Sequence, residues 1–173
     1  MASGEYPLDD PSSYPVAEIA AAWQRELPAL PVSSIEIVTP IWRLAKLLAD
    51  DRRRVLATAG VDGATLDLLS VLRRSGPPYT LTTRDIADRT LVTAGAVSQR
   101  VARAERDHLV TRTPGEGRSV LVTLTDAGHA TVERTVGLVL GREAHLVDGL
   151  TADQRTQLAG LLAVLLDQVG DRT

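Results

Sequence analysis

The sequence predicts a mainly helical fold with one small β-hairpin. Apolar residues recur at three- and four-residue spacing through most of the 173 residues, which is the spacing of amphipathic α-helices. One segment breaks this period, because Val120, Val122 and Leu124 alternate with Leu121 and Thr123, a pattern typical of a β-strand.

Prolines and helical stripes place the first helices. Pro15 suits a first helical position, and the apolar residues that follow it fall on one helical face: Val16, Ile19, Ala20, Trp23 and Leu27. Pro28 ends this helix. A second, longer helix is expected from about Ser33 to Ala59, and Pro40 should kink it or make it restart.

Two short helices should follow a helix at 64–74. Gly-Pro-Pro stops the chain after that helix. Thr82 with Asp85 is spaced to cap the first short helix, and Thr93 is placed to cap the second, which we expect to run from Ala94 to His108. A linker of only three residues separates them.

The hairpin and two long helices complete the chain. Strands at 110–113 and 119–124 surround a Pro-Gly-Glu-Gly tip. Thr125 opens a long helix, and Thr151 with Gln154 caps the last one. Helix, short turn, helix and hairpin is the order of a winged helix-turn-helix.

We therefore expect a mainly α protein with a small β-wing. A flexible tail, 1–14, precedes a single domain, 15–173, in which N-terminal helices (15–60) and C-terminal helices (125–173) flank a winged helix-turn-helix (64–124). These outer helices carry more apolar surface than so small a head requires. Their stripes fit either an intramolecular bundle or a homodimer interface, and the sequence leaves both open.

Positive charge is concentrated although the net charge is −3. That net charge by itself argues against a nucleic-acid partner, since phosphate neutralisation requires Lys and Arg. Seven arginines nevertheless fall between residues 84 and 118 of the predicted head: Arg84, Arg89, Arg100, Arg103, Arg106, Arg112 and Arg118. The basic residues are therefore where a duplex would bind.

The second short helix has one apolar and one polar face. Val97, Val101, Ala104 and His108 share one side at 3.6 residues per turn, and Gly95, Ser98, Gln99, Ala102, Arg103 and Arg106 share the other. Gln99 suits adenine and Arg103 suits guanine, whereas Thr93, Ser98 and Arg106 suit phosphates or the groove, and Arg118 at the wing suits a flanking minor groove or backbone. A merely solvated amphipathic helix is the alternative.

Several functions are not expected. There is no cysteine, which removes thiolate metal sites and cysteine nucleophiles. His108, His129 and His145 lack the spacing of a metal or catalytic motif, so no enzyme, metal or cofactor is predicted. Neither a membrane span nor a targeting segment is recognisable, which favours a cytoplasmic protein. A helical protein-interaction module without DNA binding is the rival.

The segment Leu66 to Gly128 resembles the MarR family of transcriptional regulators. The pieces "T.GAVSQRV.R.ERDHLV.R" and "LVTLTDAG" match the recognition helix, wing strand and start of the long C-terminal helix of that family. The resemblance implies a homodimer that binds double-stranded DNA at a pseudo-palindrome, usually as a repressor. The family's wing carries Asp-Arg-Arg, whereas "PGEGRS" keeps only Arg118.

The helix with "AAWQRELPAL" resembles the extra helix of the urate-responsive branch. Carried over residue by residue, the effector site of that branch corresponds to Trp23, Asp67, Arg100 and Arg112. The implied ligand is a small anion: urate, another purine, or a carboxylate such as aconitate.

Each of these residues also has a simpler interpretation. Trp23 lies on an apolar stripe typical of a core or interface, Asp67 is typical of a solvated carboxylate, and Arg112 of a surface residue. Arg100 falls about 60° from the apolar arc of its helix, and an arginine so placed needs a carboxylate partner. Asp67 is the partner that we expect, and an anion held by Arg100 and Arg112 would break this pair.

Overall fold

The computed structural model describes residues 15–90, 92–117 and 119–170. The chain divides between Arg54 and Val55 into two compact units. The second unit contains the whole helix-turn-helix segment. The predicted tail, 1–14, lies outside the described residues, and the single domain over 15–173 stays a prediction.

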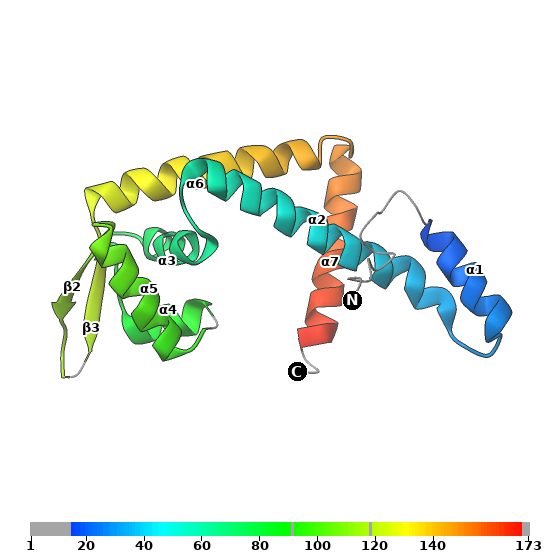
Figure 1. Cartoon of the computed structure of the whole chain (residues 1–173), viewed down its shortest axis with the longest axis horizontal. Helices are drawn as coiled ribbons and strands as arrows, with labels where there is room; N and C mark the ends of the chain where they lie inside the picture. The colour runs from blue at the N-terminus through cyan, green and yellow to red at the C-terminus, as the bar shows by residue number, and fades with distance from the viewer. Residues whose placement is uncertain (1–14, 91, 118, 171–173) are drawn as a thin grey trace, which may run out of the picture. The chain divides into compact units, whose positions relative to one another are not determined.

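The N-terminal unit contains helix α1, Val16–Glu26, a 3-10 helix at Val32–Ser34 and most of helix α2, Ile35–Ala59. Helix α1 begins at Val16, so Pro15 is its N-cap and lies one residue before the first helical position predicted for it (Figure 1). Helix α2 continues through Pro40 and does not restart there. A proline within the first two turns removes one backbone hydrogen bond, and the remaining bonds hold the helix.

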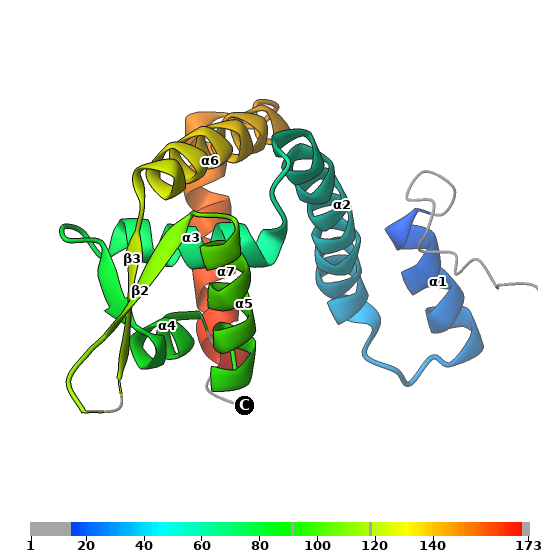
Figure 2. The same ribbon diagram turned by 60° about the vertical axis from the view of Figure 1, so that its left-hand side comes forward.

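The second unit contains the head, whose elements follow the predicted order. In sequence they are α3 (Gly63–Arg74), β1 (Thr80–Thr82), α4 (Thr83–Thr90), α5 (Ala94–Arg106), β2 (Val110–Pro114) and β3 (Val120–Leu124). Figures 1 and 2 show α3, α4 and α5 gathered together, with the β2–β3 hairpin extending from them as the wing. The predicted winged helix-turn-helix is confirmed.

Side-chain caps start the two short helices at the predicted residues. Asp85 Oδ2 accepts the backbone N–H of Thr82 (3.1 Å), and Thr82 Oγ1 accepts that of Asp85 (3.0 Å). Thr93 Oγ1 likewise accepts the N–H of Ala96 at 3.3 Å. These bonds satisfy N–H groups that have no partner within the helix itself.

The sheet has one strand more than the sequence predicts. Strand β1 pairs antiparallel with β3, in the order β1-β3-β2, and Leu81 lies opposite Val122. A strand of three residues is too short to show a period-two pattern, so only the tertiary contact with β3 reveals it.

Helix α5 ends two residues earlier than predicted. The N–H of Leu109 bonds to the carbonyl of Ala104 (2.8 Å) and that of His108 to Glu105 (3.0 Å), which is the Schellman arrangement. His108 has a φ of 58° and is exposed. It therefore does not share the buried arc of Val97, and it closes the helix by its backbone.

The core joins the head to helix α6, Asp126–Leu146. Its most deeply buried apolar residues come from α3, α4, α5, the sheet and α6: Leu66, Leu68, Leu69, Leu72, Ile86, Val97, Val101, Val110, Val122 and Val132. Gly128 lets α6 start against the wing, because a Cβ there would lie 2.1 Å from the carbonyl oxygen of Leu109. Arg73 on α3 also pairs with Glu133 on α6 at 2.7 Å.

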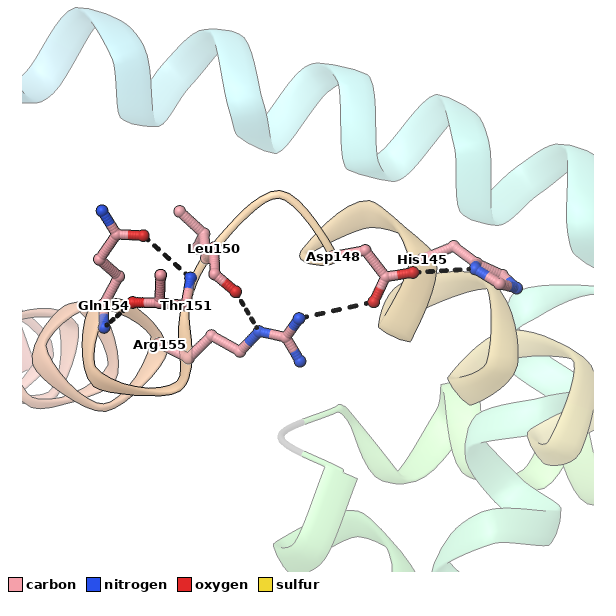
Figure 3. Close-up of polar contacts among 6 residues, drawn as sticks. All are labelled: His145, Asp148, Leu150, Thr151, Gln154 and Arg155. Atoms are coloured by element: carbon pink, nitrogen blue, oxygen red, sulfur yellow. Dashed lines mark hydrogen bonds and ion pairs between the residues drawn. The ribbon is translucent and has the colours of Figure 1, made fainter.

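Helix α7, Ala152–Gly170, follows α6 through a polar turn (Figure 3). Asp148 contacts His145 Nδ1 at 3.1 Å and Arg155 Nη2 at 3.5 Å. Thr151 and Gln154 form the predicted reciprocal cap, with bonds of 2.9 and 3.2 Å. These contacts all join residues at most seven positions apart in the sequence.

Helix α7 differs from the head in that none of its described residues is buried. Large apolar side chains are likewise exposed on α1, α2 and the second half of α6, among them Trp23, Ile37, Trp42, Leu44, Leu140 and Leu146. Among the residues that the structure describes, no single helix is long and apolar enough to span a membrane, although one bent pair, Val32–Ala59 with Gly63–Arg74, meets the length and composition criteria.

Candidate DNA-reading face and effector site

Helix α5 presents one buried and one exposed face. Val97, Val101 and Ala104 are buried in the core, and Ser98 and Gln99 are exposed. A helix with this division can pack on its own domain while its polar side meets base edges in a major groove.

The polar side chains of that face retain hydrogen-bonding capacity. Ser98 Oγ donates to the carbonyl of Ala94 at 3.0 Å, and Thr93 Oγ1 accepts the N–H of Ala96. The Thr93 hydroxyl can therefore still donate its own proton to a phosphate, whereas the Ser98 hydroxyl already donates and retains only acceptor capacity. Arg106 Nε donates to Ala102 at a long 3.4 Å, which leaves most of its guanidinium available for a phosphate.

Arg103 makes a contact that its place on the helical wheel does not predict. Its Nη1 lies 3.1 Å from Oδ2 of Asp62, the residue that caps α3. The side chain of Arg103 is still 60% exposed, so it is accessible to solvent. One residue predicted to read a base is therefore held by an aspartate of its own chain.

Arg100 and Asp67 form the predicted pair. Arg100 Nη1 lies 4.0 Å from Asp67 Oδ2, and the arginine side chain is only 25% exposed. This residue is turned toward α3, as its place on the helical wheel predicts. The pair joins the recognition helix to the helix before it.

Arg112 on β2 is bound by Glu105 on α5. Arg112 Nε donates to Glu105 Oε2 at 2.7 Å, and Nη2 contacts the same oxygen. Sequence reasoning missed Glu105, because no local spacing rule relates a helix residue to one seven positions later in a strand. Both arginines of the predicted effector site thus have carboxylate partners in the same chain.

These contacts shift the pKa values of the groups that make them. The side-chain hydrogen bond from Arg112 lowers the pKa of Glu105 below its ordinary value, and the pKa of Arg112 is raised in turn. The N–H of Thr65 lowers the pKa of Asp62, and Arg103 adds to this. All three groups are charged at neutral pH.

Two further predicted residues have no described contact with this cluster. Trp23 belongs to the N-terminal unit, where its side chain is half exposed, and its participation in the effector site stays a prediction. Arg118 lies outside the described residues. Within the described ranges, no group of three or more His, Asp or Glu residues is placed to hold a metal ion.

A helix-turn-helix with an exposed polar recognition face and a β-wing defines a class of DNA-binding domain. Comparison with known proteins narrows the class. Residues 59–119 match the model of the MarR family. The head of this chain is therefore similar to the winged helix of that family.

The similarity extends beyond the head. The chain is 28% identical over 149 residues to the HTH-type transcriptional regulator PecS of Dickeya dadantii strain 3937, covering 85% of this chain and 90% of PecS. It superposes on Sco5413, a MarR family transcriptional regulator from Streptomyces coelicolor, with a TM-score of 0.66, 25% identity and 80% and 96% coverage of the two chains. It also superposes on a mutant MarR from E. coli complexed with operator DNA, with a TM-score of 0.62 and 26% identity, covering 78% of this chain and 98% of that one.

Proposed function

We propose that this chain is a transcriptional repressor that binds a pseudo-palindromic operator as a homodimer and is released by a small anion. The amphipathic recognition helix α5 carries the proposal. Its buried face holds it on the head, and Gln99 and Ser98 lie exposed on the other. The similarity to the E. coli MarR seen with operator DNA supports the same use of this helix.

Exposed apolar residues support the homodimer. In α7 alone they include Leu158, Leu161, Leu162, Val164, Leu166 and Val169. Contiguous apolar surface of this kind is uncommon on monomers and marks an interface. A second copy of the chain is the partner that the family resemblance indicates, and it would place two recognition helices on two half-sites.

The paired arginines support the effector site. In the protein without ligand, Asp67 and Glu105 supply the negative charge beside the two arginines. A small anion such as urate carries charge of the same sign. Bound between Arg100 and Arg112, it would repel both carboxylates and break the Arg100–Asp67 pair between α5 and α3. The family resemblance adds Trp23 as the fourth member of the site.

Release of DNA follows only if the anion distinguishes two states. It must bind free protein more tightly than DNA-bound protein, and DNA must weaken anion binding by the same factor. The recognition helix contains both Arg100 and the residues that face the duplex. A change at one face therefore moves the other.

The direct test is a gel shift of the full chain on the duplex upstream of its own gene. We expect a retarded complex that weakens steeply as salt rises, because phosphate neutralisation releases counterions. Urate, xanthine, citrate and aconitate are then added in parallel, and the anion that is the effector should dissociate the protein–DNA complex. A helical interaction module without DNA binding would retard no duplex even at low salt.

Two variants test the effector residues. Asp67→Ser and Arg100→Ala should both blunt anion-driven release, because each removes one member of the pair that the anion breaks. Asp88→Ser, on the exposed side of α4, is the matched control and should respond like the parent chain. Unchanged release in both test variants would show that the site is elsewhere.

A further inference from the structure

Two ion pairs join α3 to the recognition helix, and the effector hypothesis uses only one of them. Arg100 pairs with Asp67, whereas Arg103, one turn later, pairs with Asp62. The second contact is the shorter, at 3.1 against 4.0 Å between the nitrogen and oxygen atoms. It involves a side chain that is also suited to a duplex.

The carboxylate of Asp62 is held in place by its own helix. Oδ1 accepts the backbone N–H of Thr65 at 2.8 Å, and Oδ2 accepts the Thr65 hydroxyl at 3.2 Å. These bonds make Asp62 the N-cap of α3 and lower its pKa. A fixed, ionised carboxylate therefore stands beside Arg103 at neutral pH.

Arg103 has one guanidinium for two kinds of partner. Bidentate recognition of a phosphate or a guanine edge requires two N–H groups with free directions. Nη1 lies 3.1 Å from Asp62 Oδ2, although the side chain as a whole is largely exposed. A duplex that draws the guanidinium away from Asp62 must therefore compete with an anion that the protein itself supplies.

We propose that Asp62 is a positioning residue that competes with DNA for Arg103 and so lowers the affinity of the head for its operator. The inference rests on the proposed function, because it assumes that α5 meets a duplex. The α3 cap then has two roles, since it starts the helix and its charge also restrains a DNA-reading arginine.

The substitution Asp62→Asn separates these two roles. Asparagine caps helices about as well as aspartate, so α3 should be retained, but the negative charge is lost. Exposed ion pairs contribute little, so we expect DNA affinity to rise by about twofold to fivefold per head. With two heads on one operator, the gain is roughly the square of this factor.

The experiment measures fluorescence anisotropy of the full chain on a labelled upstream duplex at several salt concentrations. Four proteins form a double-mutant cycle: the parent, Asp62→Asn, Arg103→Ala and the combination of both. Asp62→Asn should tighten binding in the parent and have no such effect once Arg103 is gone. The slope of affinity against salt should steepen by up to about 0.9 per head if Arg103 gains a phosphate.

Asp88→Asn is the matched control for removal of one carboxylate from the head. If the loss of any carboxylate raised DNA affinity by general electrostatics, Asp88→Asn would also bind DNA more tightly. The gain from Asp62→Asn would then be equal with and without Arg103. That result would overturn the proposal, as would weaker or unchanged binding by Asp62→Asn with an unaltered melting temperature. If the parent binds the duplex and the cycle fails, only this inference is lost; if no variant binds any duplex, the proposed function is lost with it.

Discussion

The head and the last helix differ sharply in how they bury leucine. On α3, Leu68, Leu69 and Leu72 are at most 1% exposed, whereas on α7 Leu161 is 58% and Leu166 is 72% exposed. Both helices are capped by a side chain at the N-terminus. Local signals therefore form both helices, but only the head closes its core within one chain.

The largest effect is expected from the exposed side of α7. The double substitution Leu161→Glu and Leu166→Glu should abolish dimers and weaken operator binding about a hundredfold or more, because one head then loses the effective concentration that its linked partner provides. Sedimentation and anisotropy measure the two effects. Gln157→Glu, on the same helix, is the charge control, and an undiminished dimer in the double variant would contradict the proposed interface.

Substitution of a buried leucine in the head tests how much stability its core contributes. Leu69→Ala removes a fully buried side chain and should lower the free energy of unfolding by about 2–5 kcal/mol. Leu166→Ala makes the same chemical change at an exposed position, and in a monomeric background it should cost less than about 0.5 kcal/mol. Urea titration followed by circular dichroism distinguishes them; equal costs would mean that α7 packs within the chain.

Substitutions at two glycines of α6 test where along this helix the packing against the head ends. Gly128→Ala would bring a Cβ to 2.1 Å from the Leu109 carbonyl and should cost about 1–3 kcal/mol, since the backbone there must shift. Apart from the neighbouring residues and backbone of its own helix, no described atom lies within 4 Å of the corresponding position at Gly137, so Gly137→Ala should stabilise the helix by up to about 1 kcal/mol. Thermal unfolding of both variants measures the opposite signs, and equal signs would contradict the close contact.

The smallest effect is expected from pH. The Thr82 hydroxyl and N–H lower the pKa of Asp85 below its ordinary value of 3.8. A lowered folded-state pKa stabilises the head above pH 3.8, and this contribution is lost as pH falls through the folded value. In urea titrations from strongly acidic to neutral pH, the free energy of unfolding should fall less at acid pH for Asp85→Asn than for the parent. Parallel curves for the two proteins would show that Asp85 does not contribute to the acid loss.

Local sequence signals located most of the fold. Threonine caps at Thr93 and Thr125 and the reciprocal pairs at α4 and α7 are contacts within four residues, so spacing alone identifies them. Strand β1 was missed because its pairing with β3 joins Thr80 to Thr123. The end of α5 was placed two residues late because His108 adopts a left-handed conformation that glycine or asparagine usually marks.

Predictions about the site divide in the same way. The helical wheel directed Arg100 inward, and the family resemblance singled out Asp67, so this pair could be expected. The contacts of Arg103 with Asp62 and of Arg112 with Glu105 join different elements. Neither is encoded in a spacing, because it depends on how α5 lies against α3 and on where β2 begins.

By itself the sequence determined the helices, the wing, the two-faced recognition helix and the family it resembles, because hydrophobic period and capping are properties of neighbouring residues. Only the tertiary structure decided which carboxylate each arginine contacts, since an ion pair requires two elements to meet within about 4 Å. Those partners matter for function, because they are the anions that a duplex or an effector must displace.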